Sequence, residues 1–223
     1  MIGVMQGRLL PPVNGQLQAF PQDWGLELEI CQNTGIDCIE WIYGSSTEHN
    51  PIADFSGARY ISRFRHPCPV VFSLCADYFV KAPLLRIPEN ILEDRLDKLE
   101  WLIFQCRLAA IPLLVLPFVD DNAIRNDSEL YAVSNMMHTL NKLVNACDVT
   151  ICLETNLSPE DTEKLLYKCP RHIRINYDTG NSASLGYSMG DEWNAYGDRI
   201  ANIHIKDRVF GGKCSLGRGQ CQF

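Results

Sequence analysis

Short apolar runs alternate with longer segments of helical periodicity along almost the whole chain. The runs are rich in Val, Ile and Leu, which is typical of strands buried on both faces. They predict seven strands, at residues 2–5, 38–43, 70–75, 113–118, 149–153, 173–177 and 200–205. Between the strands, apolar residues recur every three or four positions. This spacing predicts helices at residues 24–33, 52–64, 89–110, 128–147, from 159 onward and at 191–198.

Capping residues support two of these helices. Asp23 precedes the first predicted helix and Gly35 follows it, as expected of an N-cap and a left-handed C-cap. The segment Ser158-Pro159-Glu160-Asp161 combines a capping hydroxyl, a proline in the first turn and two acids near the positive end of a helix. We therefore expect a helix to begin at residue 159.

Strands that alternate with helices pair in parallel through right-handed crossovers. Neither G-x-G-x-x-G nor G-x-x-x-x-G-K-[ST] follows the first strand, which disfavours a Rossmann or P-loop nucleotide fold. The pattern instead predicts an α/β fold of the (β/α)8 TIM-barrel type. Because seven strands are found, we expect residues 1–223 to be a single TIM-barrel domain truncated after strand seven, lacking the C-terminal eighth βα unit.

Composition narrows the classes of protein. Of the 223 residues, 46% are hydrophobic and 21% charged, which is ordinary for a globular domain. The formal charge of -7 disfavours nucleic-acid and anionic-membrane partners. The sequence has no apolar run of about 18 residues and no signal-peptide pattern at its start, so we expect a cytoplasmic protein.

The ten cysteines are the other unusual feature of the composition. No C-x-x-C pair occurs, and most cysteines lie inside apolar helix or strand patterns. Free cysteine packs as a small hydrophobic side chain. We expect reduced structural thiols in a reducing compartment.

Three polar side chains stand at the ends of strands five, six and seven. They are Glu154, Asp178 and His204, separated by 24 and 26 residues, about one strand-helix unit each. Side chains at the carboxyl ends of successive parallel strands point into the same mouth of a barrel. Two carboxylates and an imidazole suit one divalent cation, Mn²⁺, Mg²⁺, Co²⁺ or Zn²⁺. The alternative for His204 is a core histidine whose ring is satisfied by hydrogen bonds.

The order of several short segments resembles the xylose-isomerase-like TIM-barrel superfamily, and within it the sugar phosphate isomerase/epimerase group, which is related to AP endonucleases. The resemblance covers nearly the whole chain. Its segments are Met5-Gln6-Gly7-Arg8-Leu9, Ile39-Glu40, Leu153-Glu154-Thr155, Asp178-Thr179-Gly180-Asn181, His204-Ile205-Lys206-Asp207-Arg208 and Leu216-Gly217-Arg218-Gly219.

The resemblance implies an enzyme that isomerises or epimerises a sugar or sugar phosphate by metal-assisted proton transfer through an enediolate. The family's cation would be held by Glu154, Asp178 and His204, together with a glutamate of the last strand that has no counterpart here. Glu154 would also be a catalytic acid/base. With its partner glutamate missing, we expect little activity from the 223-residue form.

Four further residues are candidates for substrate binding. Arg208 and Arg8 would take a phosphate through charge-assisted hydrogen bonds, and Asp207 would orient a hydroxyl. Glu40, in the second predicted strand, would contact substrate or pair with a basic neighbour inside the barrel. The expected partner is a small-molecule sugar, with no nucleic acid and no membrane, and the chain is a candidate homo-oligomer.

Three other functions stay open. An inosose dehydratase or a hydroxypyruvate-type isomerase would use the same fold and ligands, and a degenerate or incomplete chain would be non-catalytic. The AP endonuclease branch is disfavoured because it needs additional histidines on several strands. At position 181, where that branch has a metal-binding histidine, this chain has Asn181.

Overall fold

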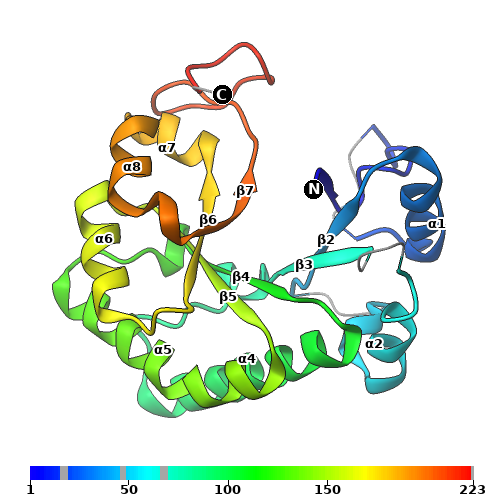
Figure 1. The fold of residues 1–223 in the computed structure, drawn as a ribbon, viewed down its shortest axis with the longest axis horizontal. Helices are drawn as coiled ribbons and strands as arrows, with labels where there is room; N and C mark the ends of the chain where they lie inside the picture. The colour runs from blue at the N-terminus through cyan, green and yellow to red at the C-terminus, as the bar shows by residue number, and fades with distance from the viewer. Residues whose placement is uncertain (16–19, 46–48, 66–69, 222–223) are drawn as a thin grey trace.

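The computed structural model describes residues 1–15, 20–45, 49–65 and 70–221, and its centre is one parallel sheet. Figure 1 shows this sheet curling, with the long helices on its outer side. Seven parallel strands in chain order form a curled half-barrel, which confirms the α/β TIM-barrel class with seven of its strands. They are β1 (Gly3–Met5), β2 (Cys38–Ile42), β3 (Val71–Cys75), β4 (Leu113–Phe118), β5 (Thr150–Thr155), β6 (Arg174–Asp178) and β7 (Ile200–His204). The extent of the domain stays a prediction.

Eight α-helices lie in the described part of the chain, and those longer than seven residues follow the predicted pattern closely. Three single turns of 3-10 helix accompany them, at Pro51–Ala53, Asp120–Asn122 and Gly197–Arg199. The α-helices are α1 (Trp24–Thr34), α2 (Phe55–Ile61), α3 (Tyr78–Lys81), α4 (Glu89–Ala109), α5 (Asp127–Cys147), α6 (Pro159–Lys168), α7 (Thr179–Leu185) and α8 (Met189–Tyr196).

The predicted caps of α1 and α6 are confirmed. The Asp23 side chain accepts a hydrogen bond from the amide of Leu26, and Gly35 adopts a left-handed conformation with φ of 76°. The Ser158 side chain accepts from the amide of Asp161.

Several element boundaries differ from the prediction for local reasons. The helix expected at 52–64 is divided, because Asp54 ends a 3-10 turn and caps α2 with its side chain. Helix α5 begins one residue early, since Asn126 caps it. Strand β5 continues past Leu153, the expected end, through Thr155. Helices α3 and α7 were not predicted, because one or two turns are too short to show a periodicity.

Alternation along the strands separates an apolar outer face from a mixed inner face. On β5, the outward Ile151 and Leu153 lie in the main core between the sheet and the helices. The inward Cys152 packs with Leu113 and Val115 of β4 in a small separate cluster. Polar inward residues follow nearer the carboxyl ends of the strands, and these residues form the candidate site.

The two edges of the described sheet are β1 and β7. The outward side chains of β6 are covered, with Ile175 4% and Tyr177 5% exposed. The outward Ile203 of β7 is 47% exposed, and Ile205 just after the strand is 67% exposed. Adjacent strands therefore differ sharply in how their outer faces are packed.

Burial is the common property of the cysteines. None of those within the described ranges forms a disulfide, and most are buried, which confirms the expected structural thiols for this part of the chain. Burial raises the pKa of Cys152 to about 12 and those of Cys31 and Cys169 to about 11.

No helix among the described residues is long and apolar enough to cross a membrane.

Candidate metal and catalytic site

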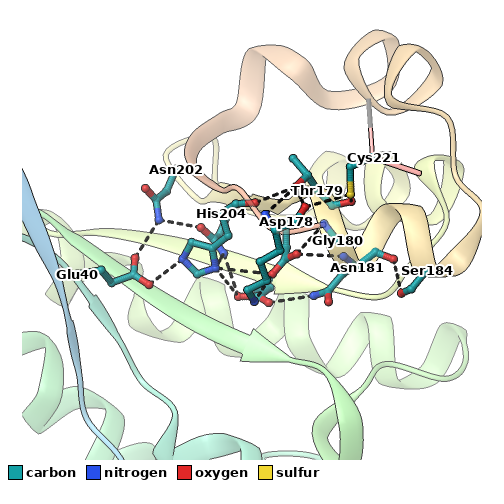
Figure 2. Close-up of polar contacts among 12 residues, drawn as sticks. Glu40, Asp178, Thr179, Gly180, Asn181, Ser184, Asn202, His204 and Cys221 are labelled. Atoms are coloured by element: carbon teal, nitrogen blue, oxygen red, sulfur yellow. Dashed lines mark hydrogen bonds and ion pairs between the residues drawn. The ribbon is translucent and has the colours of Figure 1, made fainter. Parts of the chain in front are cut away.

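The three predicted ligands meet at the carboxyl end of the sheet. One ligand atom each of Glu154, Asp178 and His204 lies within 4.8 Å of the others. The Nδ1 atom of His204 is 3.6 Å from Oε2 of Glu154 and 3.8 Å from Oδ2 of Asp178. Parallel pairing produces this arrangement, because Asp178 of β6 is in register with His204 of β7. Figure 2 shows both side chains among their polar neighbours.

The donor set fits a divalent cation. Glu154 is 7% and Asp178 4% exposed, so two buried carboxylates face one imidazole. Mixed oxygen and nitrogen donors of this kind suit Mn²⁺, Co²⁺ or Zn²⁺ and also accept Mg²⁺. The ammonium of Lys206 contacts Oδ2 of Asp178, the oxygen that faces the imidazole. A bound cation would share that oxygen with Lys206.

The two oxygens of Asp178 have different tasks. Oδ1 accepts hydrogen bonds of 3.0 Å from the backbone amides of Gly180 and Asn181 and so caps helix α7. Oδ2 is turned toward His204 and Lys206. The helix cap thus fixes the carboxylate in the orientation that a ligand needs.

Gly180 is required by the close packing of α7 on the segment that follows β7. A Cβ atom at this position would lie 2.8 Å from Cβ of Lys206 and 3.2 Å from Cγ of Arg208. The first of these distances is too short for any real side chain. The absence of a side chain at Gly180 therefore lets Lys206 approach Asp178.

The imidazole of His204 is held on both of its nitrogens. Nε2 is 2.7 Å from Oε1 of Glu40, which comes from β2 on the far side of the curled sheet. Nδ1 is 3.1 Å from the side-chain nitrogen, Nδ2, of Asn176. Oε2 of Glu40 accepts from Ser73 Oγ at 2.7 Å and from Asn202 Nδ2 at 3.0 Å. Glu40, predicted to contact substrate or a basic neighbour, thus meets the site histidine.

Three asparagines in this network were not assigned to it from the sequence. Asn176 donates to Oε2 of Glu154 at 2.9 Å, and Asn181 donates to Oε1 of the same carboxylate at 3.0 Å. Asn202 donates to Oδ1 of Asn176 at 2.8 Å. The sequence did contain a signal for two of them. Asn176 and Asn202 each lie two residues before a candidate ligand, Asp178 or His204, and residues two apart on a strand share a face.

Burial and charge shift the pKa values of the site in opposite directions. Burial raises the pKa of Glu154 and outweighs the nearby charges of His204 and Lys206. Burial also opposes ionisation of Asp178, but His204 and Lys206 outweigh it and hold the pKa of Asp178 below its ordinary value. The pKa of Glu40 is likewise lowered, because the hydrogen bond and charge of His204, with the hydrogen bonds of Ser73 and Asn202, together outweigh burial.

The same balance acts on His204. Burial disfavours the imidazolium, but the carboxylates of Asp178 and Glu40 outweigh it and raise the pKa of His204. The amide of Asn176 opposes this effect, because a proton on Nδ1 would face another donor. A cation at Nδ1 would take the place of that proton.

The remaining candidates lie on the segments that follow β7 and β1. The carboxylate of Asp207 accepts from the amide of Gly219 at 2.7 Å and from that of Cys221 at 3.3 Å, so it organises the loop after β7. Arg208 is half-buried, and its carbonyl accepts from Gln220. Arg8 is exposed, and its guanidinium donates to the carbonyl of Gln6 at 3.4 Å.

Comparison with known proteins identifies the fold. No family model matches the sequence, and no curated protein matches it. Among solved structures, IolI with a bound zinc atom is 15% identical, with a TM-score of 0.74 over 100% of this chain and 81% of that one. The 3-keto-D-glucoside 4-epimerase YcjR from E. coli is 15% identical, with a TM-score of 0.68 over 92% and 78% of the two chains.

A third similar structure is the D-psicose 3-epimerase from Clostridium cellulolyticum, determined with D-tagatose. It is 13% identical, with a TM-score of 0.69 over 98% of this chain and 76% of that one. Identities this low establish the fold alone. The resemblance seen in the sequence is confirmed at that level: the chain has the fold of the xylose-isomerase-like TIM-barrel proteins.

Proposed function

We propose that the chain is a divalent-metal-dependent isomerase or epimerase that acts on a sugar or sugar phosphate. One observation carries the proposal: ligand atoms of Glu154, Asp178 and His204 lie within 4.8 Å of one another at the carboxyl end of a TIM-barrel sheet. Active sites of this fold are formed at that end. The names of the similar structures, two sugar epimerases and a zinc-binding protein, support the same class of chemistry.

Proton transfer next to a carbonyl is the step that this site suits. A bound divalent cation supplies charge stabilisation for the oxygens of an enediolate. Glu154 is the acid/base in this proposal, because it is a buried carboxylate at the position where cation and substrate would meet. The amides of Asn176 and Asn181 each hold one of its oxygens and set its orientation.

Substrate binding is assigned to the loops around the cluster. Arg208 and Arg8 are the proposed phosphate ligands, because a guanidinium makes charge-assisted hydrogen bonds with phosphate oxygens. Asp207 is proposed to shape the loop that carries Arg208, through its bonds to Gly219 and Cys221. A sugar without phosphate would not engage the two guanidinium groups in this way.

The first test is Mn²⁺ binding by calorimetry. We expect the wild-type chain to bind one ion and the Glu154→Ala and His204→Ala variants to lose this binding. Glu160→Ala is the matched control, because Glu160 is an exposed acid on α6 and should leave the affinity unchanged. Binding that persists in both site variants would contradict the proposed cation site.

The second test detects the chemistry directly. The chain is incubated with Mn²⁺ and a panel of ketoses, aldoses and their phosphates in deuterated water, and deuterium uptake next to the carbonyl is followed by NMR. Because only one acid/base is assigned and little activity is expected from the 223-residue form, we expect slow uptake with at least one member of the panel and none with Glu154→Ala. No uptake by the wild-type chain across the panel would contradict the proposed reaction.

A further inference from the structure

We propose that Glu40 is a positioning residue that holds the Nε2 proton of His204 and thereby presents Nδ1 to the cation. The inference rests on the proposed cation site and adds a role for a residue of the opposite strand. The sequence left two expectations for Glu40, contact with substrate or pairing with a basic neighbour inside the barrel, and the proposal develops the second. Four features of the cluster carry it.

The first feature is the direction of the ring. Nε2 lies 2.7 Å from Oε1 of Glu40, within the range of a charge-assisted hydrogen bond. An ionised carboxylate can only accept, so the proton of this bond belongs to Nε2. Nδ1 is the nitrogen that faces Glu154 and Asp178, at 3.6 and 3.8 Å. The ring therefore offers Nδ1, and not Nε2, to the position between the three ligands.

The second feature is the saturation of Glu40 by protein donors. Its Oε1 is used by His204, and its Oε2 accepts from Ser73 and Asn202. The residue is only 8% exposed. A carboxylate enclosed in this way is suited to orient a neighbour and has little capacity left for a substrate hydroxyl.

The third feature is that the amides around the ring have fixed orientations. Asn202 Nδ2 donates both to Glu40 and to Oδ1 of Asn176, and Asn176 Nδ2 donates to Glu154. Reversing the Asn176 amide would set its oxygen against the Glu154 carboxylate and its nitrogen against the Asn202 donor. The network therefore also places an Asn176 N–H group on Nδ1 of His204, so Nδ1 carries no proton and a cation that binds there would displace this hydrogen bond.

The fourth feature is the chemistry that such a contact supplies. A carboxylate on the far nitrogen of a histidine fixes the tautomer and raises the basicity of the nitrogen that binds the metal. Loss of a partner of this kind typically weakens metal binding by about 10–100-fold. Glu40 thus couples β2 to a ligand set that is otherwise confined to β5, β6 and β7.

The test begins with Zn²⁺ titrations of the wild-type chain, Glu40→Ala, Glu40→Gln and Ser73→Ala. We expect Glu40→Ala to raise the Kd by about 10–100-fold. In Glu40→Gln, the side-chain oxygen can still accept from Nε2, but the charge is lost and the new amide nitrogen faces the Asn202 donor, so the Kd should lie between those of the wild-type chain and Glu40→Ala. Ser73→Ala removes another hydrogen bond of Glu40 without touching His204 and should change the Kd by less than about threefold.

A second readout needs no substitution in the proposed contact. In the Zn²⁺-loaded wild-type chain labelled with ¹⁵N-histidine, we expect the Nε2 signal of His204 to carry a proton and Nδ1 to be bound to the ion. His204→Gln assigns the resonance. Zinc on Nε2 would overturn the proposal even if Glu40→Ala does not fold.

The outcomes separate this proposal from the one on which it rests. A wild-type chain that binds neither Zn²⁺ nor Mn²⁺ would overturn both the cation site and the role of Glu40. Wild-type binding together with an unchanged Kd in folded Glu40→Ala would overturn the role of Glu40 alone. A folded Glu40→Gln that binds Zn²⁺ no more tightly than Glu40→Ala would also contradict it, since an acceptor at Nε2 would then make no difference.

Discussion

Strands β6 and β7 carry the same inward pattern, with an asparagine followed two residues later by a candidate ligand. The parallel register sets Asn176 beside Asn202 and Asp178 beside His204. The inner faces of the two strands are therefore two copies of one arrangement. Each asparagine forms hydrogen bonds within the polar layer beneath the ligands.

The outer faces of the same strands are unlike. On β6, Ile175 and Tyr177 are buried in the main core. On β7, Ile203 is half exposed. The comparison teaches that ligand geometry and stability come from different sides of the sheet. Inward hydrogen bonds orient the ligands on both strands, whereas outward packing stabilises β6 far more than β7.

The largest effect is expected on the covered side. Ile175→Ala removes a 4% exposed side chain from the core and should lower the free energy of unfolding by about 2–5 kcal/mol. Urea denaturation measures this change. A loss below about 1 kcal/mol would mean that the outer face of β6 is packed no better than that of β7.

The next largest effect is expected from cation binding at the inner faces of β5, β6 and β7. At an Mn²⁺ concentration a hundredfold above Kd, we expect about 2.7 kcal/mol of added stability, and a chelator should remove it. Because His204 lies on the less covered strand, hydrogen exchange should slow more at β7 amides than at β6 amides. Equal slowing on both strands would contradict the difference between them. As a control, Mn²⁺ should not stabilise His204→Ala.

A smaller effect is expected where α8 covers β6. Glu192 is 3% exposed and accepts hydrogen bonds from the hydroxyls of Tyr177, Ser182 and Tyr196. Glu192→Gln replaces one accepting oxygen by a donor, so the free energy of unfolding should fall by about 1–3 kcal/mol. Thermal unfolding of the exposed control Glu163→Gln should stay within about 0.5 kcal/mol of the wild-type chain.

The smallest effect is expected at Ile203, the outward residue of β7. Ile203→Ala makes the same change as Ile175→Ala, yet it should alter the free energy of unfolding by no more than about 0.5 kcal/mol. Urea denaturation of the two variants side by side gives the sharpest form of the comparison. A loss of about 2 kcal/mol or more at Ile203 would show that its face is covered in solution.

The positions of the strands and of the ligand trio could be predicted because both depend on local patterns. Apolar runs locate the strands, and Glu154, Asp178 and His204 stand at or near the strand ends, where parallel pairing brings them together. Helix α7 is too short to show a periodicity, and its N-cap, Asp178, was interpreted only as a ligand, so the capping signal was missed as well. Asp178 is both a candidate ligand and a helix cap, and the sequence pattern indicated only the first role.

The contact between Glu40 and His204 was beyond the reach of sequence patterns. The two residues are 164 positions apart, and they meet only because the sheet curls enough to bring β2 opposite β7. Curvature accumulates from strand twist and side-chain packing along the entire sheet, so no short segment encodes it. Local sequence therefore located the three candidate ligands but not the contact that joins Glu40 to one of them.

The buried cysteines can be used to detect local unfolding, because each thiol becomes accessible to alkylation only when the structure around it opens. Thiolate is the reactive form of cysteine, and burial raises the pKa values of Cys31 and Cys152, so alkylation of the closed molecule should be slow at neutral pH. Cys31 lies on α1, Cys106 on α4 and Cys152 on β5. Timed labelling read by mass spectrometry would therefore show which part of the molecule unfolds first, without any engineered probe.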